Sequence, residues 1–447
     1  MDLDLWLDGR RVARTESRDR GRKVRVVYEP EVVAEVGGEI PLLSCSLPTP
    51  GPSAPTAARA FLEGLLPEGR ALEAAASRVR GVRLRDGHPD TPADVLAVLA
   101  EYGRECAGAV VVVPAGESGD QPGRYRPLGD GRLEAAIGDL PTRPLGADPA
   151  RGIRMSLAGA QPKLLLARFG AKWFEALDGA ASTHILKPDG VWEHSAQNEA
   201  LVMTLARTLG LTDREVWVER VAGRSVFVTE RFDRVVRGRR VRRLHQEDMC
   251  QAMGRLPASK YEIGRPSGGP ARTLRVFTKD PQAEVERLFR YVAFRALVGD
   301  EDNHGKNYAL LLSGRWASLA PMYDSLCTLM YPQLSGVMAA PIGAQANLLR
   351  VTSDALIDEA RAMGLPEPGA SAVLTAMAQE MAIALDALDG ALTSGWPAER
   401  VIELIRDRVH RLQEGKPLGQ GRARPGRRIS LDEASARRTP ESDERRP

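Results

Sequence analysis

The 447-residue sequence has few cysteines, no long hydrophobic run and little net charge, and each of these deficits excludes a class of protein. Its four cysteines, Cys45, Cys106, Cys250 and Cys327, form no C-x-x-C pair. This scarcity argues against a zinc site or a disulfide framework and favours a reducing cytoplasm. The net charge of +3 is close to neutral for a chain of this length, so it gives no independent indication of nucleic-acid binding.

The hydrophobic segments are too short for a membrane protein. No apolar stretch approaches the roughly 18–20 residues that a membrane-spanning helix needs. Residues 1–20 are polar from Asp8 onward, so we expect no signal peptide. With 43% hydrophobic and 27% charged residues, the composition is that of a soluble globular protein long enough for two or three domains. We therefore expect a cytoplasmic enzyme without membrane contact.

Residues 1–145 predict a small α/β module that has no catalytic cluster of its own. Alternating apolar residues and a β-branched run between residues 2 and 36 indicate two or three short strands. The later elements expected are a helix over 57–66, a helix over 92–101 capped by Thr91, a buried strand over 107–114 and a partly irregular connection over 116–146.

Residues 146–235 predict a nucleotide-binding small lobe. A turn around Gly159 precedes the expected elements, which are strands over 163–168, 173–177 and 183–187, a helix over 197–209 and two strands over 216–221 and 225–229. This order of elements is typical of the small lobe of a kinase.

Residues 236–414 predict a mostly helical catalytic lobe, with helices over 284–298, 373–388 and 401–412. Residues 415–447 are rich in Arg, Gly, Pro and Glu, so we expect a disordered, solvated tail. The chain as a whole predicts an α/β (α+β) protein with a protein-kinase-like two-lobe fold behind an N-terminal α/β module.

The residues that carry chemistry gather just after the helix expected over 284–298. Asp302 is followed five positions later by Asn307, then by a strand-like run and by Asp324. In phosphoryl transfer Asp302 would accept the proton of a hydroxyl nucleophile, whereas Asn307 and Asp324 would hold Mg²⁺. Lys306 would stabilise the transferring phosphate. Taken alone, such a run of turn formers also fits a solvated turn, and His304 is more typical of a structural imidazole.

Other segments complete a candidate nucleotide site. Lys187 ends an apolar strand and could bind phosphates while Glu199 holds it, although a strand-end lysine that reaches solvent is commoner. The phosphate-loop signal over 154–163 is weak, because Gly159 is its only glycine. Its serine and small residues still allow backbone N–H groups to face a phosphate. The connector over 230–232 could pair with adenine, and it fits a charged surface turn equally well.

Together these segments resemble the HipA family, the serine/threonine-kinase toxins of type II toxin–antitoxin modules. Motifs that carry the resemblance include LDGRRV (7–12), FLEGLLPEG (61–69), SLAGAQPK (156–163), THILKP (183–188), ERFDR (230–234), GDEDNHGKN (299–307) and APMYDSL (320–326). The resemblance covers residues from about 3 to 413 and leaves out the tail. Pro162 departs from it, because a glutamate is common there.

The resemblance implies a kinase that depends on ATP and Mg²⁺, with Asp302 as catalytic base assisted by Lys306, and with Asn307 and Asp324 as metal ligands. The residues it assigns to ATP and its metal are Ser156, Ala158, Gly159, Ala160, Lys187, Glu230, Arg231, Phe232, His304, Asn307 and Asp324. It also implies that Ser156 is autophosphorylated, which would eject its loop and switch the enzyme off.

The family's targets are aminoacyl-tRNA synthetases, and its usual partner is a small helix-turn-helix antitoxin. The resemblance therefore implies a protein substrate of that kind and contact with DNA only indirectly, through the antitoxin. Two other readings remain open at this point. The chain could be a catalytically weak regulatory subunit that acts with a DNA-binding antitoxin in operator repression, or a small-molecule kinase of related fold.

Overall fold

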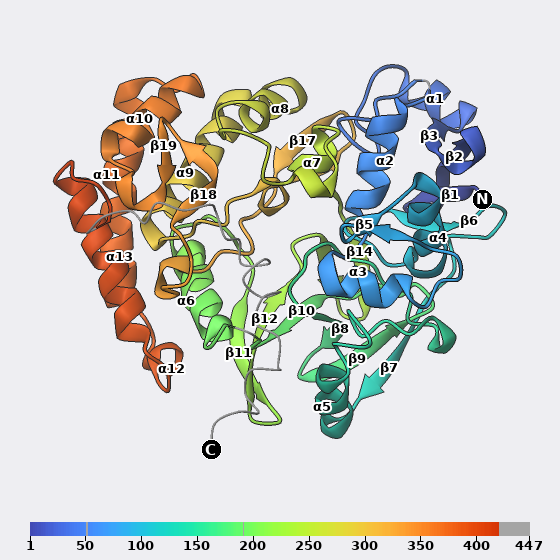
Figure 1. Cartoon of the computed structure of the whole chain (residues 1–447), viewed down its shortest axis with the longest axis horizontal. Coiled ribbons are helices and arrows are strands. Elements are labelled where there is room, and N and C mark those ends of the chain that lie inside the picture. Colours follow the sequence, from blue (N-terminus) through green and yellow to red (C-terminus); the bar gives the residue numbers. More distant parts are fainter. Residues whose placement is uncertain (51, 191, 420–447) are drawn as a thin grey trace.

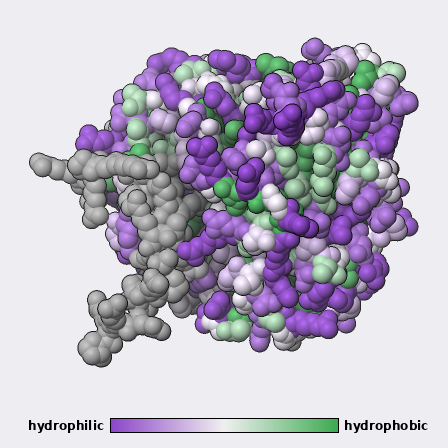
Figure 2. Space-filling model, turned by 45° about the vertical axis from the view of Figure 1, so that its right-hand side comes forward, coloured by the Kyte–Doolittle hydropathy of each residue, from purple (hydrophilic) through white to green (hydrophobic). Residues whose placement is uncertain are grey.

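The computed structural model describes residues 1–50, 52–190 and 192–419. Figure 1 shows three parts that follow one another along the chain, namely an N-terminal module, a small lobe built on one sheet and a mainly helical lobe. The module and the helical lobe lie on opposite sides of the picture, with strands of the small lobe between them. The face in Figure 2 is mostly hydrophilic, with hydrophobic residues only in small groups.

The N-terminal module is an antiparallel four-stranded sheet with helices packed on it. The strand order is β3-β2-β1-β6, with β1 (Leu3–Leu7), β2 (Arg10–Arg18), β3 (Lys23–Tyr28) and β6 (Val111–Pro114). Its helices are α1 (Pro30–Val36), α2 (Pro55–Gly64), α3 (Gly69–Ala76) and α4 (Pro92–Tyr102), and a short hairpin joins β4 (Leu84–Arg85) to β5 (His88–Pro89). Thr91 caps α4 in a capping box with Asp94, as the sequence predicts.

The small lobe is a six-stranded antiparallel sheet in the order β11-β12-β10-β8-β9-β7. Its strands are β7 (Arg124–Leu128), β8 (Leu164–Phe169), β9 (Lys172–Leu177), β10 (His184–Pro188), β11 (Val216–Val221) and β12 (Arg224–Glu230). Helix α6 (Ser195–Thr208) packs against β11 and β12. The strands and the helix predicted between residues 163 and 229 are therefore confirmed.

The connection over residues 116–146, predicted to be partly irregular, contains one strand and one helix that the sequence did not predict. Strand β7 pairs with β9, and α5 (Asp130–Gly138) buries Leu133 and Ile137 in the core cluster of the small lobe. The strand is hard to recognise from the sequence because its residues are only partly buried and Pro127 interrupts the pattern. The sequence predicts that the small lobe begins at residue 146, but one strand of its sheet, β7, lies earlier in the chain.

The C-terminal lobe is mainly helical, and it contains more strand than the sequence predicts. Its helices are α7 (Met249–Ala252), α8 (Gly269–Phe277), α9 (Pro281–Val298), α10 (Ser353–Ala362), α11 (Glu367–Asp386), α12 (Gly390–Thr393) and α13 (Ala398–Gln413). The strands are β13 (Arg234–Arg237), β14 (Arg240–Arg243), β15 (His245–Asp248), β16 (Ala309–Ser313), β17 (Trp316–Leu319), β18 (Val337–Ile342) and β19 (Gln345–Asn347). The three long helices expected from periodicity are confirmed as α9, α11 and α13.

The first residues of the expected tail are ordered. Leu418 is fully buried, and the N–H groups of Leu418 and Gly419 donate to Val351 O at 2.8 Å and Leu349 O at 2.9 Å. The disorder predicted from residue 415 is therefore wrong for residues 415–419, and residues 420–447 lie outside the described residues. Within the described ranges, no helix has the length and apolar character that crossing a bilayer requires.

Candidate active site

Arg295, in the last turn of α9, contacts two segments: the loop that carries Asp302 and Asn307, and the segment that carries Asp324. Its buried guanidinium pairs with Asp300 and donates to the carbonyl oxygens of Tyr323 at 2.9 Å, Asp324 at 3.2 Å and Asn307 at 3.4 Å. Helix α9 ends at Gly299 in a left-handed cap, which turns the chain straight into the loop. One side chain therefore holds two segments that the sequence separates.

The loop from Asp302 to Asn307 is fixed through its backbone. The carbonyl oxygen of Asp302 accepts hydrogen bonds from Asn307 Nδ2 at 2.6 Å and from the His304 N–H at 2.9 Å, and the Asp302 N–H donates to Asp300 Oδ1 at 3.0 Å. The amide nitrogen of Asn307 is thereby committed to the loop. No described group donates to its amide oxygen, which is the atom suited to a cation.

Lys187 lies between two carboxylates. Its Nζ is 2.7 Å from Glu199 Oε1 and 2.6 Å from Asp324 Oδ1. Lys187 and Glu199 are buried, whereas the Asp324 side chain is 40% exposed. The partnership with Glu199, expected from the sequence, is confirmed. Because strand β10 carries the lysine and α6 the glutamate, the sheet and its packed helix together fix the ammonium group.

The pKa shifts of these groups follow from burial and shared charge. Burial alone would lower the pKa of Lys187, but the two carboxylates hold it above its usual value. Burial raises the pKa of Glu199, and Asp324 adds to the rise because both acids share one ammonium. The pKa of Asp324 lies well below its usual value: its desolvation is outweighed by Lys187 and then by Lys163. Asp324 is therefore an anion at neutral pH.

Asp324 also has a strained backbone. Its φ of 54° places it in the left-handed region, which non-glycine residues seldom occupy. Arg295 holds this conformation by donating hydrogen bonds to the carbonyl oxygens of Tyr323 and Asp324. The next residue is also fixed, because Ser325 Oγ donates to Asp300 Oδ2 at 2.8 Å. Strain of this kind persists where the surroundings overdetermine it, and it aims the carboxylate at Lys187.

The candidate phosphate loop is folded against the N-terminal module. Ser156 is fully buried; its N–H donates to Glu105 O at 2.8 Å and its hydroxyl to Leu65 O at 2.6 Å. The N–H of Glu68 donates to Gly159 O at 3.4 Å. In this conformation the Ser156 hydroxyl faces Leu65 at the end of α2.

Lys163 stabilises the candidate phosphate loop through a hydrogen bond to its backbone. Its buried Nζ donates to Ala158 O at 2.9 Å, and a Cβ at position 159 would lie 2.2 Å from that nitrogen, at a φ of +113°. Gly159 is therefore the residue that this turn requires. Burial, reinforced by the charge of Lys187, lowers the pKa of Lys163 to about 8. Among the described groups, the N–H groups of Ala158, Gly159 and Ala160 have no acceptor, which suits them to phosphate oxygens.

Lys306 is committed to an internal network. Its Nζ lies 2.5 Å from Asp248 Oδ2 and 3.9 Å from Glu68 Oε1, and Lys260 Nζ lies 2.8 Å from Glu68 Oε2. Burial alone would lower the pKa of Lys306, but Asp248 and Glu68 raise it. The segment Leu65–Glu68 of the N-terminal module thus contacts both the candidate phosphate loop and the loop from Asp302 to Asn307.

In the connector at 230–232, the side chain of Arg231 points to the N-terminal module, whereas the ring of Phe232 packs next to the residue before Asp324. The side chain of Arg231 donates to Glu105 at 3.1 Å and to Asp233 at 2.8 Å, and its N–H donates to Thr183 O. This residue, expected near adenine, uses its side chain to join the small lobe to the N-terminal module. The Phe232 ring packs 5.2 Å from Tyr323, and the Glu230 N–H donates to Glu215 O.

A divalent cation fits the donor atoms present, namely the carboxylate of Asp324 and the amide oxygen of Asn307. No cluster of three or more His, Cys, Asp or Glu residues suited to a metal occurs in the part of the chain that the structure describes. Such a sparse oxygen set suits Mg²⁺, which usually takes one or two carboxylates plus substrate phosphates, and does not suit zinc.

Several residues that build this site were not predicted from the sequence, namely Glu68, Lys163, Asp248, Lys260, Arg295 and Asp300. One signal was present: Arg295 lies on the apolar face of α9, between Phe294 and Ala296. An arginine at a buried helical position needs a partner, so it marks an internal ion pair. Lys163 is the last residue of the motif SLAGAQPK, and the sequence predicted no role for it.

Known proteins match almost the whole chain. The model of the HipA-like C-terminal domain matches residues 155–385, and that of the HipA N-terminal domain matches residues 3–113. "Putative kinase Y4mE" of Sinorhizobium fredii is 35% identical over 379 residues, covering 82% of this chain and 86% of the relative. The serine/threonine-protein kinase toxin HipA of Shewanella oneidensis is 27% identical over 338 residues, covering 72% and 75%.

The fold has a solved counterpart. The structure of the Shewanella oneidensis HipA, HipB and operator DNA complex contains a chain that matches with a TM-score of 0.77 at 24% identity, covering 92% of this chain and 97% of that one. The expected kinase-like α/β fold is therefore confirmed. From the two domain matches and the extent of the similarity to Y4mE, the chain belongs to the HipA family.

Proposed function

We propose that this protein is a serine/threonine protein kinase that uses ATP and Mg²⁺. The observation that carries the proposal is Lys187, which is paired with Glu199 at 2.7 Å and with Asp324 at 2.6 Å. A strand lysine braced by a helix glutamate, next to a metal-binding acid, is the arrangement with which protein kinases hold the phosphates of ATP. The named relatives, a kinase toxin among them, support the same proposal.

Each residue of the site has a role in this proposal. Lys187 binds the α- and β-phosphates, and the N–H groups of the loop at 158–160 bind phosphate oxygens. Bound Mg²⁺, held by Asn307 and Asp324, would offset the negative charge of the phosphates. Asp302 accepts the proton of the acceptor hydroxyl, which on general acid–base magnitudes contributes roughly 10²–10⁴-fold to the rate.

The remaining residues support the nucleotide and the transferring group. Lys306 contributes positive charge near the reacting phosphate once nucleotide binding rearranges the network around Asp248. His304 braces the catalytic loop beside the nucleotide. The connector at 230–232 borders the adenine ring with its backbone and with Phe232.

We also propose that Ser156 is the autophosphorylation site and that its modification switches the enzyme off. A phosphate adds roughly −1.5 to −2 charges, which cannot be accommodated where the Ser156 hydroxyl is buried against Leu65 O. The loop at 156–160 would have to leave its place, and the N–H groups that face ATP would leave with it.

The proposed partners follow the HipA family. The solved complex of the Shewanella oneidensis protein contains HipB and operator DNA, which supports an antitoxin protein as a partner of this chain. We propose a helix-turn-helix antitoxin that links the kinase to DNA, and an aminoacyl-tRNA synthetase as the protein substrate, so that kinase activity arrests translation.

The test is transfer of label from γ-labelled ATP in the presence of Mg²⁺ to the protein itself and to proteins of a cell lysate. Asp302→Asn, Asp324→Asn and Lys187→Met should abolish or strongly reduce the label, and Ser156→Ala should remove the self-label. Asp358→Asn, a change of the same kind on the exposed face of α10, should label like wild type. Mass spectrometry of the labelled lysate identifies the acceptor.

Two outcomes would overturn the proposal. Wild type that transfers no phosphate to any protein, yet binds an antitoxin and its operator, would support the alternative of a catalytically weak regulatory subunit. Label found only on small molecules would replace the protein acceptor by a metabolite. Circular dichroism of every variant separates loss of chemistry from loss of fold.

A further inference from the structure

The hairpin of β13 and β14 carries an unusual concentration of arginine. Two strands of four residues each, Arg234–Arg237 and Arg240–Arg243, pair only with each other in a two-stranded sheet. The strands and the turn between them hold six arginines and no acidic residue, namely Arg234, Arg237, Arg239, Arg240, Arg242 and Arg243. The chain as a whole has a net charge of only +3, so this charge is local.

The register places arginines opposite each other twice. Arg234 faces Arg243 and Arg237 faces Arg240 across the two strands. Like charges directly opposite in an antiparallel pair destabilise it unless a counter-charge is present. The pair of Arg234 and Arg243 has such a counter-charge, whereas the pair of Arg237 and Arg240 has none among the described residues.

The inner pair, Arg234 and Arg243, has carboxylate partners. Glu105 of the N-terminal module lies 2.9 Å from Arg234 and 2.6 Å from Arg243 through different carboxylate oxygens. Asp233 adds a second carboxylate at 2.9 Å from Arg234. Arg234 and Arg243 therefore dock this face of the hairpin on the N-terminal module.

The outer face has no such partner. Side chains alternate along a strand, so Arg237, Arg240 and Arg242 share the face opposite to Arg234 and Arg243. All three are exposed, and none has a carboxylate of the described residues within ion-pair distance. Arg239, in the turn, instead lies over the Phe174 ring at 5.0 Å.

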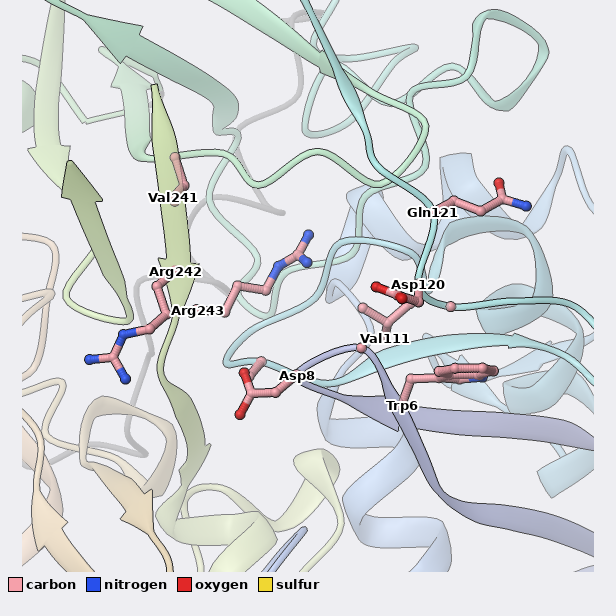
Figure 3. A pocket seen from close by; sticks show the side chains of 11 residues that line it. Trp6, Asp8, Val111, Asp120, Gln121, Val241, Arg242 and Arg243 are labelled. Atoms are coloured by element: carbon pink, nitrogen blue, oxygen red, sulfur yellow. The ribbon is translucent and has the colours of Figure 1, made fainter. Parts of the chain in front are cut away.

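Figure 3 shows the two faces of the hairpin at neighbouring residues of β14: the side chains of Arg242 and Arg243 extend to opposite sides of the strand. Val241, Arg242 and Arg243 border a cavity of about 360 Å³ whose other walls include Trp6, Asp8 and Asp120. The acidic residues near the hairpin therefore lie on its inner side. Arg242 points away from them.

We infer that the outer face formed by Arg237, Arg240 and Arg242 binds the phosphate backbone of a nucleic acid. Guanidinium groups pair with phosphate oxygens in a bidentate manner and remain charged at any physiological pH. A two-stranded ribbon also has dimensions that fit a nucleic-acid groove. A protein partner is the weaker fit, since interfaces between proteins need an aromatic or aliphatic anchor, and Val235, the apolar residue of this face, is itself partly buried.

The test measures fluorescence anisotropy of a labelled DNA duplex and of a labelled RNA stem-loop, both of arbitrary sequence, with the full-length protein across a series of salt concentrations. The triple variant R237Q/R240Q/R242Q removes the charges of the outer face. The matched control R80Q/R85Q/R315Q removes three exposed arginines from scattered positions. Preferential binding of one probe identifies DNA or RNA as the source of the phosphates.

Wild type and the control variant should bind at least one probe, and the hairpin variant should bind it roughly tenfold more weakly at moderate salt. Its plot of log affinity against log salt should be shallower by about 2–3, at about 0.9 per lost phosphate contact on duplex DNA and about 0.7 on a single strand. The melting temperature of the hairpin variant should equal or exceed that of wild type, because only repulsion is removed.

Equal binding by wild type and the hairpin variant, or an equal loss in the control, would overturn the inference. So would binding of an acidic peptide such as polyglutamate by wild type without binding of either nucleic acid, since this would make the face a protein-binding site. None of these outcomes depends on kinase activity. The inference can therefore fail or stand independently of the proposed function.

Discussion

The guanidinium of Arg295 donates a hydrogen bond of 3.2 Å to the carbonyl oxygen of Asp324, the acid whose backbone is left-handed. The same group forms an ion pair with Asp300, which precedes the loop from Asp302 to Asn307. The geometry of the proposed metal-binding acid therefore depends on a buried residue of α9 that has no proposed role in binding nucleotide or metal. This relationship makes the site sensitive to changes away from its reacting groups.

Arg295→Met should lower the free energy of unfolding by about 3–5 kcal/mol, because Asp300 would be left as a buried carboxylate without its cation. Urea denaturation monitored by circular dichroism measures the change. The control is Arg287→Met on the same helix, where the pair with Glu284 is partly exposed and should contribute under about 1 kcal/mol. Equal effects of the two substitutions would contradict a special role for Arg295.

Glu247 predicts a specific pH dependence of stability. It is fully buried and accepts hydrogen bonds from Ser44 Oγ at 2.5 Å and Cys45 N at 2.7 Å, with no cation of the described residues at ion-pair distance. Burial raises the pKa of this carboxyl group to about 7. The folded state therefore binds a proton that the unfolded state has released, so this group makes stability fall as pH rises from about 4.5 to about 7.

Glu247→Gln should remove that loss. Between pH 5 and pH 8 the stability of wild type relative to the variant should fall by about 2–3 kcal/mol, on the basis of 1.36 kcal/mol per pKa unit. Urea melts of both proteins at the two pH values give this difference directly, because other titrating groups are common to both. Parallel pH profiles would show that Glu247 ionises normally in the folded protein.

Glu68→Gln should slow the proposed phosphoryl transfer by roughly 10–100-fold while leaving the KM for ATP close to that of wild type, since small displacements of a catalytic loop have effects of this size. The reason is that Lys306 and Lys260 share the Glu68 carboxylate, which fixes the loop that carries Asp302. Glu73→Gln, an exposed change on α3, is the control. A rise in KM alone would place the role of Glu68 in nucleotide binding.

Ser156→Asp should release the phosphate loop without any kinase reaction. The new carboxylate would replace a buried hydroxyl that donates to Leu65 O, and two oxygens that can only accept hydrogen bonds would then face each other. Hydrogen exchange over residues 157–163 and at the Glu68 N–H should become faster than in wild type. Ser156→Ala should lose about 1 kcal/mol of stability and keep the loop protected. Equal protection in both variants would mean that the loop tolerates the charge in place.

Local features of the site could be predicted from the sequence, because they depend on short stretches with a clear period. Lys187 and Glu199 lie 12 positions apart, on a strand and on the helix that follows it, so their ion pair results from one local unit. The loop from Asp302 to Asn307 follows a helix with a regular apolar face, and its spacing identifies it. These elements require no knowledge of the tertiary fold.

The supporting residues could not be predicted in the same way, since their partners lie far away in the sequence. Lys306 pairs with Asp248, 58 positions earlier, and Ser44 donates to Glu247, 203 positions later. The side chain of Arg231 contacts Glu105 across 126 positions, which only the docking of two parts brings about. Strand β7 was missed because half-exposed residues give little periodicity, although it completes the sheet of the small lobe.

The carboxylate of Glu105 limits how this protein can be dissected. A fragment cut at the start of the C-terminal family match, residue 155, would retain Arg231, Arg234 and Arg243 and lose the acid that all three contact. Arg231 and Arg234 would then share only Asp233 and Arg243 would lose its carboxylate partner, so such a fragment should aggregate or remain unfolded. The two family domains are units of sequence similarity, and we expect autonomous folding only of a chain that contains both.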